Sequence, residues 1–192
     1  MRLDHQVIGD LISPGSSVLD LGCGDGDLLQ WLAAEKQVRG QGLEIDEQAI
    51  YRCVSKGLSV LHGDLDKGLA EYHDRSFDYV ILNQSLQQIV HFDSTLMEAL
   101  RVGRSVIVGF PNFAHYIARF QIGVRGRAPV TSSLPYMWYE SPNVHFLSIS
   151  DFIAYCKARE LKILQRVFLN DKRRVVVFPN LFATIGIFML AS

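Results

Sequence analysis

The chain has 192 residues, of which 48% are hydrophobic and 20% charged, so it has the size and composition of one globular domain and is neither disordered, collagenous nor a coiled coil. The net charge is −1, but residues 1–100 carry 16 acids and 7 bases, whereas residues 101–192 carry 4 acids and 12 bases. The neutral total argues against sequence-independent nucleic-acid binding, and the uneven halves predict a basic surface in the second half.

Several features of the sequence indicate the cellular compartment of the protein. They are the spacing of its cysteines and histidines and the composition of its first and last segments. The cysteines are odd in number and lack CxxC spacing, and the histidines lack ligand spacing, so we expect neither disulfides nor a metal site. Asp10 and Pro14 interrupt the opening segment, which lacks a signal-peptide core, and the apolar residues 181–191 are too short for a membrane helix. We therefore expect a cytoplasmic protein with no membrane association. The cysteines are Cys23, Cys53 and Cys156.

Apolar runs alternate with segments of helical spacing along most of the chain. Helices are predicted at 3–12, from about 28, from 47 to about 56 with Asp46 as N-cap, at 94–100, and at 151–160 with Ser150 as cap. Strands are predicted at 17–21, 38–45, 59–62, 77–82, 105–110, 161–169 and 181–190.

This alternation predicts an α/β fold, a doubly wound and mostly parallel sheet that ends in an antiparallel hairpin. We expect one domain over 1–192. It comprises an opening helix (1–14), a nucleotide-binding half (15–110), an insertion rich in aromatic residues and arginine (111–149), and a terminal helix and strand hairpin (150–192).

A strand that opens into three glycines is the strongest local motif. Gly22, Gly24 and Gly26 allow close approach of a ligand, and the following helix offers free N–H groups. A dinucleotide fingerprint would place its third glycine at position 27, where the chain has Asp27 beside Asp25. Carboxylates at this helix start would repel a pyrophosphate, which disfavours the alternative of an NAD-binding protein.

The segment Asp20-x-Gly22-x-Gly24-x-Gly26 resembles the glycine loop of class I S-adenosylmethionine-dependent methyltransferases. The resemblance implies that Glu44 holds the ribose hydroxyls, that Asp64 lies beside the adenine amino group, and that the loop from Asn83 faces the methionine part. It also implies seven strands, with the last, antiparallel one between the fifth and sixth. The implied contacts to S-adenosylmethionine or S-adenosylhomocysteine are Asp20, Gly22, Cys23, Gly24, Gly26, Glu44, Ile45, Asp64, Leu65 and Asn83.

Each of these residues also has a purely structural interpretation. Asp20 and Asp64 are common turn-closing residues, Glu44 precedes a helix cap as surface acids often do, and Cys23 is more simply a small filler than a nucleophile. The combination over residues 17–85, in the correct order, favours the cofactor pocket.

Motifs of the second half, including Phe110-Pro-Asn-Phe113, Arg125-Gly-Arg127, Leu134-Pro-Tyr-Met-Trp-Tyr139 and Ser141-Pro-Asn-Val-His145, closely resemble the MetW family of methionine biosynthesis proteins. The resemblance spans nearly the whole chain. It implies an accessory or regulatory subunit that acts with a homoserine O-acyltransferase of the MetX type, acetyl or succinyl. A genuine small-molecule methyltransferase is the alternative.

Two features of the second half bear on these alternatives. Residues 99–139 contain five arginines and neither acid nor lysine, interleaved with aromatic residues; this is typical of a protein interface, and a solvated arginine face is the other interpretation. Candidate bases for methyl transfer are Tyr136, His145 and His115, but none has a placed partner in the sequence, so the catalytic residue stays unassigned.

Overall fold

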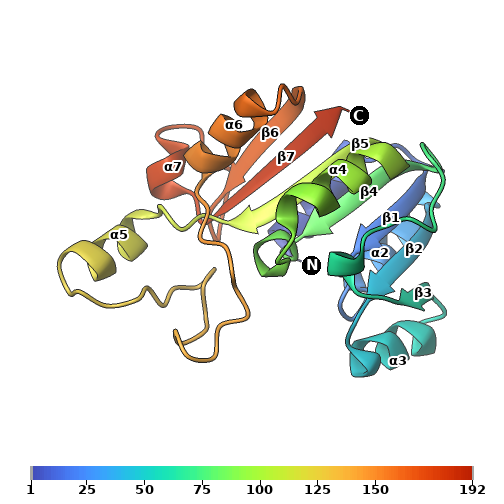
Figure 1. The fold of residues 1–192 in the computed structure, drawn as a ribbon, viewed down its shortest axis with the longest axis horizontal. Coiled ribbons are helices and arrows are strands. Elements are labelled where there is room, and N and C mark those ends of the chain that lie inside the picture. Colours follow the sequence, from blue (N-terminus) through green and yellow to red (C-terminus); the bar gives the residue numbers. More distant parts are fainter. Residues whose placement is uncertain (1, 192) are drawn as a thin grey trace.

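The computed structural model describes residues 2–191, which form a seven-stranded sheet with helices on both faces (Figure 1). The strands lie in the order β3-β2-β1-β4-β5-β7-β6. They are β1 Ser17–Leu21, β2 Arg39–Glu44, β3 Ser59–His62, β4 Phe77–Asn83, β5 Gly103–Pro111, β6 Ile163–Leu169 and β7 Ile185–Ala191. The helices are α1 Leu3–Leu11, α2 Asp27–Lys36, α3 Glu47–Ser55, α4 Phe92–Val102, α5 Tyr116–Gly123, α6 Ile149–Ala158 and α7 Pro179–Phe182.

Strand directions confirm the predicted doubly wound sheet. β1 to β5 pair in parallel, and β7 pairs antiparallel with both β5 and β6. β7 therefore lies between the fifth and sixth strands, as expected. The strand order reverses direction between β1 and β4, and such a switch point opens a crevice at the carboxyl ends of the strands.

Alternate side chains of the central strands fill two separate cores. On one face Val80, Val106 and Phe188 pack with α4 and α6, and on the other Ile81 and Ile107 pack with α1 and α2. Because every second residue points to the opposite face, strands covered on both sides are apolar throughout, which is the pattern seen in the sequence.

The prediction of a strand from position 181 is wrong for its first residues. Pro179–Phe182 form α7, and β7 begins only at Ile185. Pro179 supplies the fixed φ that suits the first helical position, and the Ala183 N–H donates to the Pro179 carbonyl. Apolar composition alone did not distinguish this single helical turn from the strand after it.

The cap of α6 also differs from the prediction. The helix begins at Ile149, and Ser148 rather than Ser150 caps it, in a capping box in which the side chains of Ser148 and Asp151 each accept a backbone N–H of the other residue. This box satisfies two N–H groups at the helix start.

The insertion projects from the carboxyl end of the sheet as an arm, visible in yellow and light orange in Figure 1. It contains α5, which the sequence analysis did not predict. Where the arm returns to the body, the Gln87 carbonyl accepts the N–H groups of Val144 and His145, and these two hydrogen bonds anchor the returning segment. Between residues 2 and 191, no helix combines the length and the apolar character needed to cross a membrane.

Candidate functional site

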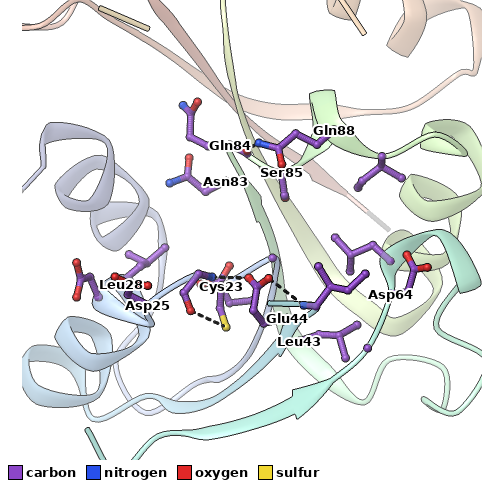
Figure 2. Close-up of a pocket in the computed structure, with 18 of the residues that line it drawn as sticks. Cys23, Asp25, Leu28, Leu43, Glu44, Asp64, Asn83, Gln84, Ser85 and Gln88 are labelled. Carbon is purple, nitrogen blue, oxygen red and sulfur yellow. Dashed lines mark hydrogen bonds between the residues drawn. The ribbon is translucent and has the colours of Figure 1, made fainter. Parts of the chain in front are cut away.

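A cavity of about 640 Å³ lies at the carboxyl ends of β1, β2 and β4, at the switch point of the sheet (Figure 2). Nine of the predicted site residues line it: Asp20, Gly22, Cys23, Gly24, Glu44, Ile45, Asp64, Leu65 and Asn83. Gly26, the tenth, does not line it. Four segments distant in the sequence thus meet around one hollow.

The glycine loop takes backbone conformations that favour glycine. Gly22, Gly24 and Gly26 have φ values of 77°, 53° and 74°. A Cβ on Gly22 would lie 2.8 Å from the Cβ of Ser85, so glycine here lets the loop approach the chain after β4. A Cβ on Gly24 would meet no atom within 4 Å. Gly24 therefore presents bare backbone to the cavity.

Glu44 is held rigidly at the end of β2 by three backbone N–H groups. Its Oε2 accepts from Gly24 at 2.8 Å, and its Oε1 accepts from Ile45 at 2.8 Å and Asp46 at 3.0 Å. Figure 2 shows the carboxylate at the centre of the lower wall. A carboxylate has about four acceptor positions, so Glu44 both ties the glycine loop to β2 and keeps capacity to accept from a ligand.

Asp20 lies at the floor of the cavity and is almost fully buried, with 3% of its surface exposed. Burial and the nearby charge of Glu44 raise the pKa of Asp20 to about 7. Burial, aided by Asp20, also raises the pKa of the Cys23 thiol well above its usual range. Cys23 is therefore protonated, which argues against a nucleophilic role.

Acidic side chains dominate the cavity. Its lining contains Asp20, Asp25, Asp27, Glu44, Asp64 and Asp66 but, as bases, only Arg2 and His5. Asp25 is paired with Arg52 of α3 and Asp27 with Lys56, the residue that follows this helix, and no sequence motif indicated these pairs. The unpaired acids that remain favour a ligand with positive charge over a pyrophosphate. Among residues 2–191, no cluster of three His, Cys, Asp or Glu side chains is suited to a metal ion.

The wall opposite Glu44 is polar and comes from the chain after β4. Asn83, Gln84, Ser85 and Gln88 lie along it in Figure 2. The Asn83 amide donates to the buried Asp4 carboxylate of α1 at 3.1 Å, while its Oδ1 is buried without a hydrogen-bond partner. Buried polar atoms are rarely left unpaired, so Asn83 Oδ1 is an acceptor that no other protein group satisfies.

The structure separates the three candidate bases. Tyr136, from the arm, lines the cavity, whereas His115 and His145 do not. His145 instead lies beside Phe92, with ring centroids 5.9 Å apart, and His115 is buried near the base of the arm. Arg2 and His5 also line the cavity, although no sequence motif marks them, because α1 folds over the sheet.

Gly24 and Gly26 are expected to respond differently to alanine. In Gly26→Ala the Cβ would lie 2.5 Å from Leu58 and 2.8 Å from Cys53, so we expect a loss of about 2 to 4 kcal/mol in the free energy of unfolding. Gly24→Ala should lose only about 1 kcal/mol, from its positive φ, and should weaken ligand binding instead. Urea unfolding measures the loss of stability in both variants, and calorimetry measures ligand binding. Equal losses of stability would contradict the assignment of Gly26 to packing and of Gly24 to the ligand cavity.

Comparison with solved structures shows the class of protein. A methyltransferase described as S-adenosylmethionine-dependent, from Mesorhizobium loti, superposes with a TM-score of 0.70 at 17% identity, covering 97% of this chain and 96% of that one. The [4+2]-cyclase SpnF superposes with a TM-score of 0.69 at 12% identity, covering 98% and 80%. The chain therefore has the class I methyltransferase fold, and the second match shows that this fold also occurs in a protein named for another reaction.

Sequence comparison gives the family. The model described as "Methionine biosynthesis protein MetW" matches residues 2–190. The chain belongs to the MetW family of methionine biosynthesis proteins. It is also 36% identical over 160 residues to the "Bifunctional methionine biosynthesis protein MetXA/MetW" of Rhodopirellula baltica, a match that covers 79% of this chain and 26% of the relative. The chain thus spans about a quarter of the length of that relative.

Proposed function

We propose that this protein is an S-adenosylmethionine-binding accessory or regulatory subunit that acts with a homoserine O-acyltransferase in methionine synthesis. The single observation that carries the pairing is the relative whose name joins MetXA and MetW in one chain, of which this protein matches only a part. A function supplied by two linked modules in one organism is commonly supplied by two associated chains in another. Three free cysteines support a cytoplasmic location.

The chemistry of the residues that line the first cavity supports binding of the cofactor. Glu44 would accept from the ribose hydroxyls, Asp64 and Leu65 would flank the adenine, and Asn83 would face the methionine part. Bound there, the cofactor would supply a sulfonium and a transferable methyl group. The surplus of acids compensates positive charge, and the exposed backbone at Gly24 leaves room for close approach.

The accessory role is favoured over methyl transfer because the cavity has little to activate an acceptor. Tyr136 is the one aromatic hydroxyl in its lining, and it is 49% exposed on the arm. A genuine methyltransferase remains the second candidate, supported by the position of Tyr136 where an acceptor would enter. Transfer of label from methyl-labelled cofactor to a small molecule in cell extract, lost in Tyr136→Phe, would favour that candidate.

The arm provides the surface for an acyltransferase partner. It carries exposed large apolar side chains, and Trp138 is 76%, Tyr139 63% and Phe146 66% exposed. Arg125 lies over the Phe120 ring, 5.4 Å from its centroid. Exposed aromatic residues flanked by arginine are the usual anchors of protein interfaces, and burying them would stabilise a complex.

Replacement of both Trp138 and Tyr139 by alanine is expected to weaken binding to the acyltransferase by at least tenfold, because it removes two exposed anchors. Co-purification and calorimetry with the acyltransferase from the same organism measure this. Tyr51→Ala is the matched control, since Tyr51 is 72% exposed on α3, away from the arm. Equal binding by the double variant and the control would remove the arm from the interface.

Regulation is tested in the complex itself. Acyltransferase activity is measured with and without this protein, and across a range of S-adenosylmethionine concentrations. Activation that does not change with S-adenosylmethionine would support a subunit that acts by assembly alone. Activity that changes with the ligand would support end-product sensing. A ligand can shift activity only if it binds the active and inactive forms of the complex with different affinities. No effect of the protein on acylation would overturn the proposal.

A further inference from the structure

A second cavity, of about 770 Å³, adjoins the first and is not explained by cofactor binding. It lies between α1, the chain after β4, the arm and the β6–β7 loop. Arg2, Gln84, Gln88 and Tyr136 line both cavities, so the two hollows share a wall. A molecule in the second cavity would therefore lie next to the wall from which Asn83 faces the cofactor cavity.

The side chain of Gln87 indicates that this second cavity is a binding site. Gln87 is only 4% exposed, and it lines the second cavity but not the first. Its Nε2 donates to the Gln84 carbonyl at 2.7 Å, while its Oε1 is buried with no hydrogen-bond partner. A buried acceptor without a partner is unfavourable, so a ligand that donates a hydrogen bond to it would be stabilised.

Gln84 supplies the complementary group. Its Nε2 is a buried donor without a partner, and its backbone has a φ of 63°, which is uncommon for a residue other than glycine. Residues with uncommon backbone conformations cluster at functional sites, where their side chains often contact a ligand. Gln84 and Gln87 therefore offer a free donor and a free acceptor from one short loop.

Charged groups of both signs line the same cavity. Asp171 accepts from the Ser132 hydroxyl of the arm at 3.0 Å, which fixes its carboxylate, and Lys172 follows it in the β6–β7 loop. Arg2 and Asp4 form an ion pair on the side of α1, with 2.7 Å between their atoms. The charges in the lining balance, so the cavity does not favour a singly charged molecule or a phosphate.

We propose that this second cavity binds a small α-amino acid in its zwitterionic form, beside the cofactor cavity. The ammonium would donate to Asp171 and the Gln87 Oε1, and the carboxylate would accept from Lys172 and the Gln84 amide. The inference rests on the proposed cofactor site only for the identity of the neighbouring ligand, and it assigns to the accessory subunit a second small molecule, either a methyl acceptor or an effector.

The test is calorimetry of the full chain, first with S-adenosylhomocysteine alone and then with L-homoserine, L-serine and L-methionine in its presence. We expect at least one of these amino acids to bind. Its des-amino and its carboxamide analogues, each of which lacks one charge, should bind at least tenfold more weakly because each leaves one pair of protein groups unsatisfied. Binding of none of the three amino acids, or equal binding of the analogues, would overturn the proposal.

Variants locate the site. Gln87→Leu, which has similar volume but no hydrogen-bonding groups, should weaken amino-acid binding about tenfold or more, and Lys172→Met should weaken it through the carboxylate. Gln30→Leu, on the exposed face of α2, is the matched control and should bind normally. Normal binding by both site variants would overturn the location. If the wild-type chain does not bind S-adenosylhomocysteine, the proposed cofactor site is refuted instead. Failure of the amino-acid site and failure of the cofactor site are therefore distinguishable.

Discussion

An Asp20→Asn variant is expected to be more stable than the wild type at pH 8 and to bind S-adenosylmethionine more weakly. Both effects come from one carboxyl group that is buried at the floor of the cavity, where its pKa is raised to about 7. A neutral amide of the same shape avoids the cost of burying a negative charge, and it provides no negative charge for a cationic ligand.

The sign of the stability effect follows from proton binding. Between about pH 4 and pH 7 the folded wild type retains the Asp20 proton that the unfolded chain has lost, so wild-type stability falls as pH rises through this window. The variant lacks this dependence. Its advantage should therefore grow from about pH 4, level off above pH 7, and reach about 2 to 4 kcal/mol.

Urea unfolding of both proteins at pH 3, 4, 5, 6, 7 and 8 measures the difference. Asp78→Asn provides a control of opposite sign, because hydrogen bonds from the Ser17 N–H and hydroxyl lower the pKa of Asp78. That variant should lose stability relative to the wild type at neutral pH and approach it in acid. An Asp20→Asn advantage that does not change with pH would refute the buried, protonated carboxyl.

Glu44→Ala is expected to lose at least tenfold in affinity for S-adenosylmethionine and about 1 to 3 kcal/mol in the free energy of unfolding. Three backbone N–H groups lose their acceptor, among them that of Gly24 in the glycine loop. The proposed ribose contact disappears at the same time. Glu44→Gln keeps one acceptor oxygen and should show intermediate losses.

Calorimetry and urea unfolding measure the two losses separately. Glu47→Ala is the matched control, since Glu47 is exposed in the first turn of α3, outside the cavity lining. It should bind normally and lose at most a few tenths of a kcal/mol. If Glu44→Ala destabilised the protein but retained full affinity, Glu44 would be a structural acid that joins the loop to β2, and the ribose assignment would fall.

The sequence predicted the first half of the molecule well, because the residues that line the cavity there follow directly on the strands in chain order. The strand, glycine loop and helix around Gly22 to Gly26 form as expected, and Asp46 caps α3 through the Gln48 N–H. Glu44 and Asp64 come at strand ends, and the carboxyl ends of parallel strands meet at one edge of a sheet. Local signals were sufficient because turn glycines and caps act within a few residues.

Prediction was weaker in the insertion and at the end of the chain. α5 has no clear apolar period in its sequence, and the turn at Pro179 lies inside an apolar stretch. The sequence also left three candidate bases equivalent. Only the fold separates them, because the arm brings Tyr136 to the cavity while His145 packs against Phe92.

The sequence by itself determined the α/β class through its periodicity, and its motifs resembled those of the family to which the chain belongs. It also predicted most of the acids and glycines that line the first cavity, because local backbone geometry fixes the spacing of such motifs. Tertiary structure alone decided three things: that Arg2 and His5 line the cavity, that Arg52 and Lys56 pair with Asp25 and Asp27, and that a second polar cavity adjoins the first. Each requires packing between segments far apart in the chain, and no local signal encodes such distances.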